Sequence, residues 1–116
     1  MMKVEKIKKM GRKTVIPWSR WGKNNILIVQ WFGYSDKLDR FGKRLLIFKV
    51  VGGSVTGFPT KSGQDICLYS TKLLKDQIKY INEGTIISIN YGGIHCGEKY
   101  DYHLIKVFSN YSLDQT

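Results

Sequence analysis

Residues 65–91 read DICLYSTKLLKDQIKYINEGTIISINY and contain the pattern that decides the fold. Both ends of this stretch, residues 65–69 and 85–91, are rich in aliphatic, aromatic and β-branched side chains, which predicts a strand at each end. Residues 71–81 between them predict a helix, because aliphatic side chains recur at helical spacing on one face. These side chains are Leu73, Leu74, Ile78 and Ile81. One helix therefore separates two strands.

Three further segments have the composition of strands. Residues 26–34 (ILIVQWFGY) and 44–51 (RLLIFKVV) precede the helix, and residues 100–108 (YDYHLIKVF) come last. Polar or glycine-rich connections are expected at residues 35–43, at residues 52–63, and around Gly92, Gly93 and Gly97. The chain thus predicts three strands, a helix and two strands, in that order.

This order of elements predicts an all-β domain of the OB type, a five-stranded barrel with one helix between strands three and four. Five short strands in an open sheet would leave edges that invite aggregation, whereas closure into a barrel removes the edges. A length of 116 residues fits a single domain. We expect this domain to span residues 26–110, with a basic arm over residues 1–25 and a tail over residues 111–116.

The formal charge is +10 and the pI is near 9.7, from nineteen Lys and Arg against nine Asp and Glu. The excess is concentrated in residues 1–23, which hold eight bases and one acid. A basic surface gains free energy when phosphates release their counterions, so a polyanionic partner is expected. The candidate phosphate contacts in this region are Lys8, Lys9, Arg12 and Lys13. A basic segment that only maintains solubility is the alternative.

Trp18 and Trp21 lie in the second half of the arm, where Pro17 excludes a continuous helix. Two indole rings are costly to leave in water, so this half is expected to pack on the domain or on a ligand. One short apolar stripe precedes it, formed by Val4, Ile7 and Met10. This stripe is too weak to favour insertion into a membrane, and no segment reaches the roughly 20 apolar residues of a membrane span. No membrane partner is expected.

A catalytic or metal site is not expected either. The acidic residues are scattered, and the adjacent His95 and Cys96 lack further ligands at zinc-binding spacing. The glycines of residues 52–57 are not followed by the Gly-Lys-Ser/Thr of a phosphate-binding loop. We therefore expect no enzyme activity, no metal and no cofactor. The two cysteines form no disulfide framework, and the charged first residues lead into no secretory apolar stretch, so a cytoplasmic location is expected.

Two segments carry a resemblance to a known family: residues 83–93 (EGTIISINYGG) and residues 102–107 (YHLIKV). Together with the paired leucines of the expected helix, they resemble phage-type OB-fold single-stranded-DNA-binding proteins. The resemblance covers about residues 26–108 and departs at Ile105, where an aromatic residue is commoner. It implies the OB-fold and a non-catalytic role on single-stranded DNA in replication or recombination.

Proteins bind single strands through aromatic faces that stack bases and cations that follow the backbone. Both kinds of residue occur on the expected strands and in the first hairpin. The candidates are Trp31, Tyr34, Arg40, Phe41, Lys43, Lys49, Tyr102 and Lys106. Alternation along residues 44–51 assigns Leu46, Phe48 and Val50 to the core and Lys49 to the outer face.

We expect these candidates to form one groove on the strand face with which OB-folds bind ligands. The expected phosphate contacts in this groove are Lys43, Lys49 and Lys106. The expected stacking residues are Trp31, Phe41 and Tyr102. Two alternatives remain open. The domain binds RNA, because stacking and cations do not distinguish the sugar, or it is a virion or replisome adaptor that binds a protein through Trp18 and Trp21.

Overall fold

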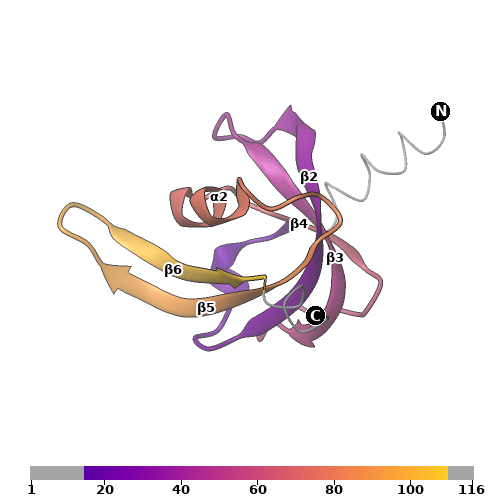
Figure 1. Ribbon diagram of the computed structural model, residues 1–116. Helices are drawn as coiled ribbons and strands as arrows, with labels where there is room; N and C mark the ends of the chain where they lie inside the picture. The colour runs from indigo at the N-terminus through magenta and orange to yellow at the C-terminus, as the bar shows by residue number, and fades with distance from the viewer. Residues whose placement is uncertain (1–14, 110–116) are drawn as a thin grey trace.

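The computed structural model describes residues 15–109. Its six strands form one sheet in the order β1-β4-β3-β2-β5-β6 (Figure 1). The strands are β1 (Val15–Ile16), β2 (Ile26–Leu38), β3 (Arg44–Ser54), β4 (Asp65–Leu68), β5 (Ile86–Cys96) and β6 (Asp101–Phe108). A 3₁₀ helix, η1 (Trp18–Arg20), follows β1, and the α-helix α2 (Lys72–Ile78) lies between β4 and β5. The predicted contacts Lys8, Lys9, Arg12 and Lys13 and the tail 111–116 lie outside the described residues.

The fold is mostly β with one short α-helix, as the order of the sequence signals predicts, but the expected five-stranded closed barrel is wrong. The sheet has six strands and is open, because β4 is not paired with β6. β4 pairs instead in parallel with β1, which places Val15 opposite Cys67 and Ile16 opposite Leu68. A two-residue strand beside Pro17 is too short to give a recognisable pattern in the sequence. The second half of the expected arm thus contributes a strand to the sheet.

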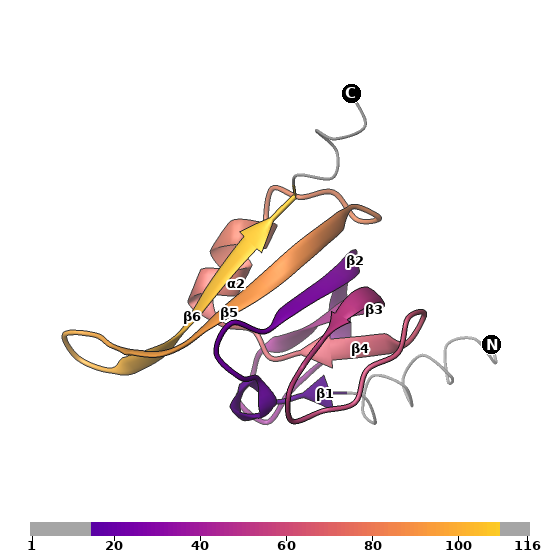
Figure 2. The same cartoon turned by 90° about the horizontal axis from the view of Figure 1, so that it is seen from below.

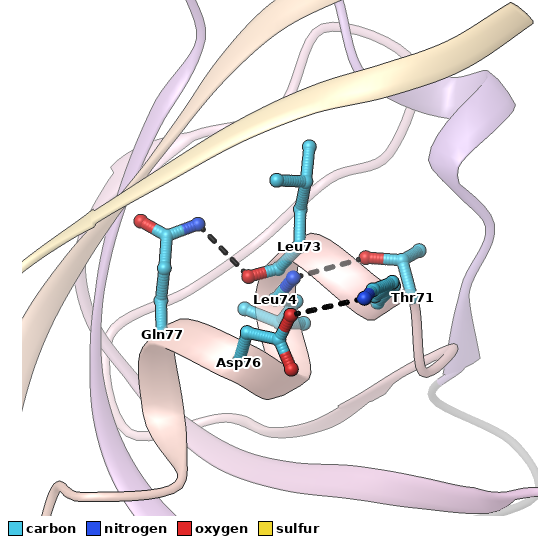
Figure 3. A network of polar contacts seen from close by, with 6 residues as sticks. Thr71, Leu73, Leu74, Asp76 and Gln77 are labelled. Carbon is cyan, nitrogen blue, oxygen red and sulfur yellow. Dashed lines mark hydrogen bonds and ion pairs between the residues drawn. The ribbon is translucent and has the colours of Figure 1, made fainter.

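Gln77 of α2 occupies the free edge of β6. Its amide nitrogen donates to the carbonyl of Ile105 at 2.7 Å, and its amide oxygen accepts from the N–H of Val107 at 2.8 Å. The same nitrogen donates to the carbonyl of Leu73, which holds the side chain against its own helix (Figure 3). One side chain therefore satisfies two backbone groups of an edge strand that would otherwise lack partners.

Aromatic rings connect the β4 side of the sheet with β5 and β6. Trp18 donates its indole N–H to the carbonyl of Tyr69, directly after β4, at 3.0 Å. Its ring stacks on Tyr91 of β5 with centroids 6.0 Å apart and lies 6.4 Å from the ring of His103 on β6. Trp18 and Trp21 are only 4% and 5% exposed. Both rings therefore belong to the core, which confirms the expectation that this half of the arm packs on the domain. The alternative in which these two rings anchor a partner protein at the surface does not fit their burial.

The inward side of the curved sheet holds the hydrophobic core, and α2 packs on it (Figure 1). Leu46, Phe48 and Val50 of β3 point inward, as alternation predicts. Leu74 and Ile78 of α2 are fully buried in the same cluster. The helical spacing of the leucines and isoleucines in the sequence thus identifies the face of α2 that meets the sheet.

Three strands are longer than the sequence predicts. Their added ends are Leu38 in β2, Ser54 in β3 and Cys96 in β5. Gly92 and Gly93, expected in a turn, lie inside β5, where the pairing with β6 shifts register between Tyr91 and Ile94. As a result β5 and β6 form a long hairpin whose tip extends away from the rest of the sheet (Figures 1 and 2).

Candidate nucleic-acid interface

The outer face of the sheet exposes alternate residues of β2. They are Ile26, Ile28, Gln30 and Phe32. Gln30 is paired with Lys49 on β3, whereas Ile26 is paired with Asn90 on β5, which is in turn paired with Lys106 on β6. Because directly paired residues share a face, Lys49 and Lys106 both lie on this outer face. In a flat sheet their Cα atoms would be about 20 Å apart.

Phe32 presents an exposed ring on this face. The pairing of β2 with β3 shifts between Trp31 and Gly33, where Gly33 adopts a φ of 103° and forms a bulge. On this backbone Trp31 turns into the core, and Phe32 turns outward with 41% of its surface exposed. The ammonium of Lys49 lies 5.9 Å from the centroid of the Phe32 ring, within range of a cation–π interaction. A ring and a cation are therefore held together at an exposed position.

A second cationic region lies on the β6 side of the same face. Lys106 lines a hollow of about 400 Å³ where β5 and β6 meet the loop before β2. Its polar lining includes Lys23, Asn90, His95 and Lys106. Phe108 is exposed two residues farther along β6. This side of the face thus also combines cations with an exposed ring.

The hairpin between β2 and β3 carries another exposed ring. The carboxylate of Asp39 accepts from the backbone N–H groups of Phe41 and Lys43, at 2.8 and 3.0 Å, which fixes the hairpin tip. The Phe41 ring is 65% exposed and contacts Tyr69 edge-on with centroids 6.3 Å apart. The guanidinium of Arg40 lies 5.1 Å from the same ring. Phe41 is therefore available to a ligand although its position is fixed from two sides.

The structure divides the predicted groove into separate regions. Lys49 and Lys106 share the outer sheet face, as expected. Four other candidates gather around the first hairpin: Tyr34, Arg40, Phe41 and Lys43. Tyr102 is exposed on the long β5–β6 hairpin, where its ring lies 6.0 Å from that of His95. No contact joins Lys43, Lys49 and Lys106 into one groove within the described part of the chain.

Trp31 corrects the predicted set of stacking residues. Its ring is 3% exposed and packs against Phe48 and Tyr34, with centroids 5.1 and 5.2 Å away. A base cannot reach this ring, so Trp31 is a core residue. Its neighbour Phe32, which the sequence reasoning missed, occupies the exposed position. Alternation places Trp31 and Phe32 on opposite faces of β2, but it does not indicate which of the two faces meets the core.

Within residues 15–109, burial shifts the pKa of three groups, none of which belongs to the Phe32–Lys49 pair. Burial, with a smaller contribution from the charge of Asp65, raises the pKa of the Cys67 thiol to about 11. Burial also raises the pKa of Tyr91 and lowers the pKa of His103. The Tyr91 hydroxyl lies 2.5 Å from Nδ1 of His103, and the two shifts favour a phenol that donates to a neutral imidazole. Cys67 and Tyr91 are buried core residues, and the ring of His103 packs against Tyr91.

Neither a metal site nor a membrane helix was found between residues 15 and 109. No three His, Cys, Asp or Glu side chains of that part of the chain come together as ligands for a metal ion. Neither of its helices has the length and apolar character needed to cross a membrane.

Comparisons with known proteins add no relative: no protein-family profile, curated protein sequence or solved structure matches the chain. Function is therefore inferred from the side chains that the fold brings to its surface.

Proposed function

We propose that the protein binds single-stranded DNA without catalysing a reaction, as a partly open OB-type domain that acts in replication or recombination. The observation that carries this proposal is the Lys49 ammonium 5.9 Å from the exposed ring of Phe32, on the outer face of the sheet. A base stacked on this ring brings its own phosphate close to Lys49. Stacking platforms beside cations are the usual means by which proteins bind single strands.

The exposed ring accounts for a preference for single strands. In a duplex, neighbouring bases cover both faces of each base, so a ring on a sheet cannot stack on it. A single strand can turn a base onto Phe32, and such a contact contributes about 1–3 kcal/mol. Lys49, Lys106 and Lys23 would contact phosphates, which carry no sequence information.

The charge of the surface supports a polyanionic ligand. Between the described residues the only ion pair joins Lys72 and Asp76, whose side-chain atoms are 3.8 Å apart. No carboxylate of residues 15–109 lies within ion-pair distance of the other basic side chains in that range. A bound phosphate backbone would neutralise these charges with release of counterions.

The arrangement of the strands supports an OB-type architecture. Five longer strands follow one another in the order β4-β3-β2-β5-β6, and α2 lies between β4 and β5. OB-folds are partly open barrels that bind oligonucleotides on central strands and adjoining hairpin loops. Here the corresponding surface is the outer face of β2 and β3 with the hairpin that joins them.

The test is a fluorescence anisotropy titration with three ligands of equal length, about 12 nucleotides, which lies within the site sizes of OB domains. The ligands are oligothymidylate, oligouridylate and duplex DNA, each at two salt concentrations. We expect oligothymidylate to bind at least about fivefold more tightly than the duplex, since one stacked base contributes at least about 1 kcal/mol. Tighter binding of oligouridylate than of oligothymidylate would indicate that the ligand is RNA rather than DNA. Equal, weak binding of duplex and single strand that vanishes at moderate salt would contradict the proposal and favour a protein-binding adaptor.

A further inference from the structure

Four basic side chains from two separate segments line one hollow between the first hairpin and α2. The hollow has a volume of about 630 Å³. Lys43 and Arg44 reach it from the hairpin and the start of β3, and Lys72 and Lys75 reach it from α2. Asp76 is the acidic residue in its lining, and its carboxylate lies 3.8 Å from the Lys72 ammonium. Three of the four positive charges are thus left without a carboxylate partner among the described residues.

Repulsion between these like charges is unfavourable unless a bound anion or counterions from solution compensate it. Part of the wall is apolar or aromatic and is formed by Tyr34 and Leu38. The hydroxyl-bearing residues Ser70 and Thr71 complete the lining on the α2 side. The Thr71 hydroxyl oxygen already accepts from the N–H of Leu74 (Figure 3). The positive charge of the hollow therefore comes from its lysines and arginine.

An exposed aromatic ring adjoins the hollow. Phe41 precedes Gly42 and Lys43, both of which line the hollow, and its ring rests against Tyr69, the residue before Ser70. Phe41 is 65% exposed, so its ring is accessible from solvent, with the Arg40 guanidinium 5.1 Å from its centroid. A flat apolar surface and a basic hollow thus lie side by side. These are the two surfaces that a nucleotide needs, one for its base and one for its phosphate.

We propose that the Phe41 ring and this basic hollow form a nucleotide subsite that binds one base and the adjoining phosphodiester of a nucleic-acid strand. The subsite is separate from the Phe32–Lys49 pair, and it extends the binding surface from the sheet onto α2. The inference rests on the proposed function, because its ligand is a segment of the same strand. Lys72 and Lys75 bind phosphate in this subsite, and Phe41 stacks the base.

The first test measures the hollow without DNA. Inorganic tripolyphosphate is titrated into the full chain while amide chemical shifts are followed by NMR. We expect the shifts to concentrate at Gly42, Ser70 and Thr71, and to disappear in the double variant Lys72→Gln/Lys75→Gln. Small shifts spread evenly over all basic segments, or shifts unaffected by the double variant, would overturn the subsite whatever the DNA measurements give. Thermal unfolding checks that the variants keep the fold.

The second test measures the strand itself, with an oligothymidylate of about 16 nucleotides, the upper end of the site size of an OB domain. Loss of two phosphate contacts should reduce the slope of log K against log salt by about 1.4. Lys61→Gln/Lys99→Gln is the matched control, since it removes the same charge from exposed loop lysines outside the hollow. Phe41→Ala should lower affinity about 5- to 150-fold. Equal slopes for the two double variants would overturn the passage of the strand through the hollow.

The two tests separate this inference from the proposed function. If the wild type binds no oligothymidylate, the proposed function fails, and so does the subsite as a place for a strand. If the wild type binds oligothymidylate but the double variant and its control behave alike, only the subsite fails. A concentrated tripolyphosphate response together with a selectively reduced salt slope supports both.

Discussion

Gln77→Ala removes the side chain that caps the free edge of β6. In the wild type the amide of Gln77 satisfies the carbonyl of Ile105 and the N–H of Val107, at 2.7 and 2.8 Å. Ile105 is fully buried, so water cannot freely replace the lost partner of its backbone. Alanine leaves both strand groups unpaired and also opens a small gap between α2 and β6.

The expected loss of stability follows from these two bonds. A hydrogen bond contributes about 0.5–1.5 kcal/mol net, and a buried group left without a partner costs about 1–3 kcal/mol. The higher helix propensity of alanine restores about 0.3 kcal/mol of stability. We therefore expect the free energy of unfolding to fall by about 2 kcal/mol, which lowers the melting temperature by roughly 8–16 °C in a domain of this size.

Urea unfolding followed by circular dichroism measures this change, and hydrogen exchange at the Val107 amide reports the edge directly. Gln30→Ala is the matched control, because its side-chain amide also donates to a backbone carbonyl, that of Gly84, but at an exposed position. The control should lose less than about 1 kcal/mol. A Gln77→Ala variant as stable as Gln30→Ala, with unchanged protection of Val107, would refute the view that this side chain replaces a strand at the sheet edge.

Three further predictions follow from buried groups. Trp31→Ala should destabilise the fold by about 3–5 kcal/mol because it empties a core position. Trp31→Phe should leave single-strand affinity within about twofold of wild type. A large loss of binding without a loss of stability would show that Trp31 contacts the ligand. A thiol reagent near neutral pH should modify exposed Cys96 quickly and Cys67 only after unfolding in urea, since burial raises the pKa of Cys67 to about 11. Equal rates of modification at the two cysteines in the folded protein would contradict this. Burial lowers the pKa of His103 below its ordinary 6.5, so the unfolded state binds its proton first, and stability should decline as pH falls through 6.5 toward the folded pKa. His103→Gln should remove that part of the pH dependence in urea titrations, and an unchanged slope would show that His103 does not cause it.

Local pattern predicts most of the elements but not how the sheet ends. Aliphatic spacing identifies α2 and its buried face, and alternation identifies the inward residues of β3. The open sheet depends instead on Gln77 and Trp18, whose partners lie 28 to 51 residues away along the chain. Such distant pairings leave no periodic signal. β1 escapes prediction because two residues carry no period.

The binding residues divide in a similar way. Composition and alternation correctly place Lys49 and Lys106 on the outer face, because both depend only on strand period. The exchange of Trp31 for Phe32 as the exposed ring depends on which face of β2 meets the core, and nothing in the isolated strand decides that. The grouping of Lys43 with Lys72 and Lys75 depends on the packing of a hairpin against a helix distant in sequence. Helical spacing shows that Lys72 and Lys75 are exposed, but it does not show which residues they face.

The most direct test of single-strand binding on the outer face compares two similar ring–cation pairs. Lys79 lies 5.1 Å from the exposed ring of Tyr80, just as Lys49 lies 5.9 Å from Phe32, but the first pair follows the end of α2 and is not on the paired strands β2 and β3. Anisotropy with labelled oligothymidylate is measured for Phe32→Ala, Lys49→Gln, Tyr80→Ala and Lys79→Gln. Phe32→Ala should weaken binding about 5- to 150-fold, with Lys49→Gln also weaker, while the Tyr80 and Lys79 variants stay within about twofold of wild type. Equal effects at both pairs, or none at Phe32 and Lys49, would contradict binding on this face.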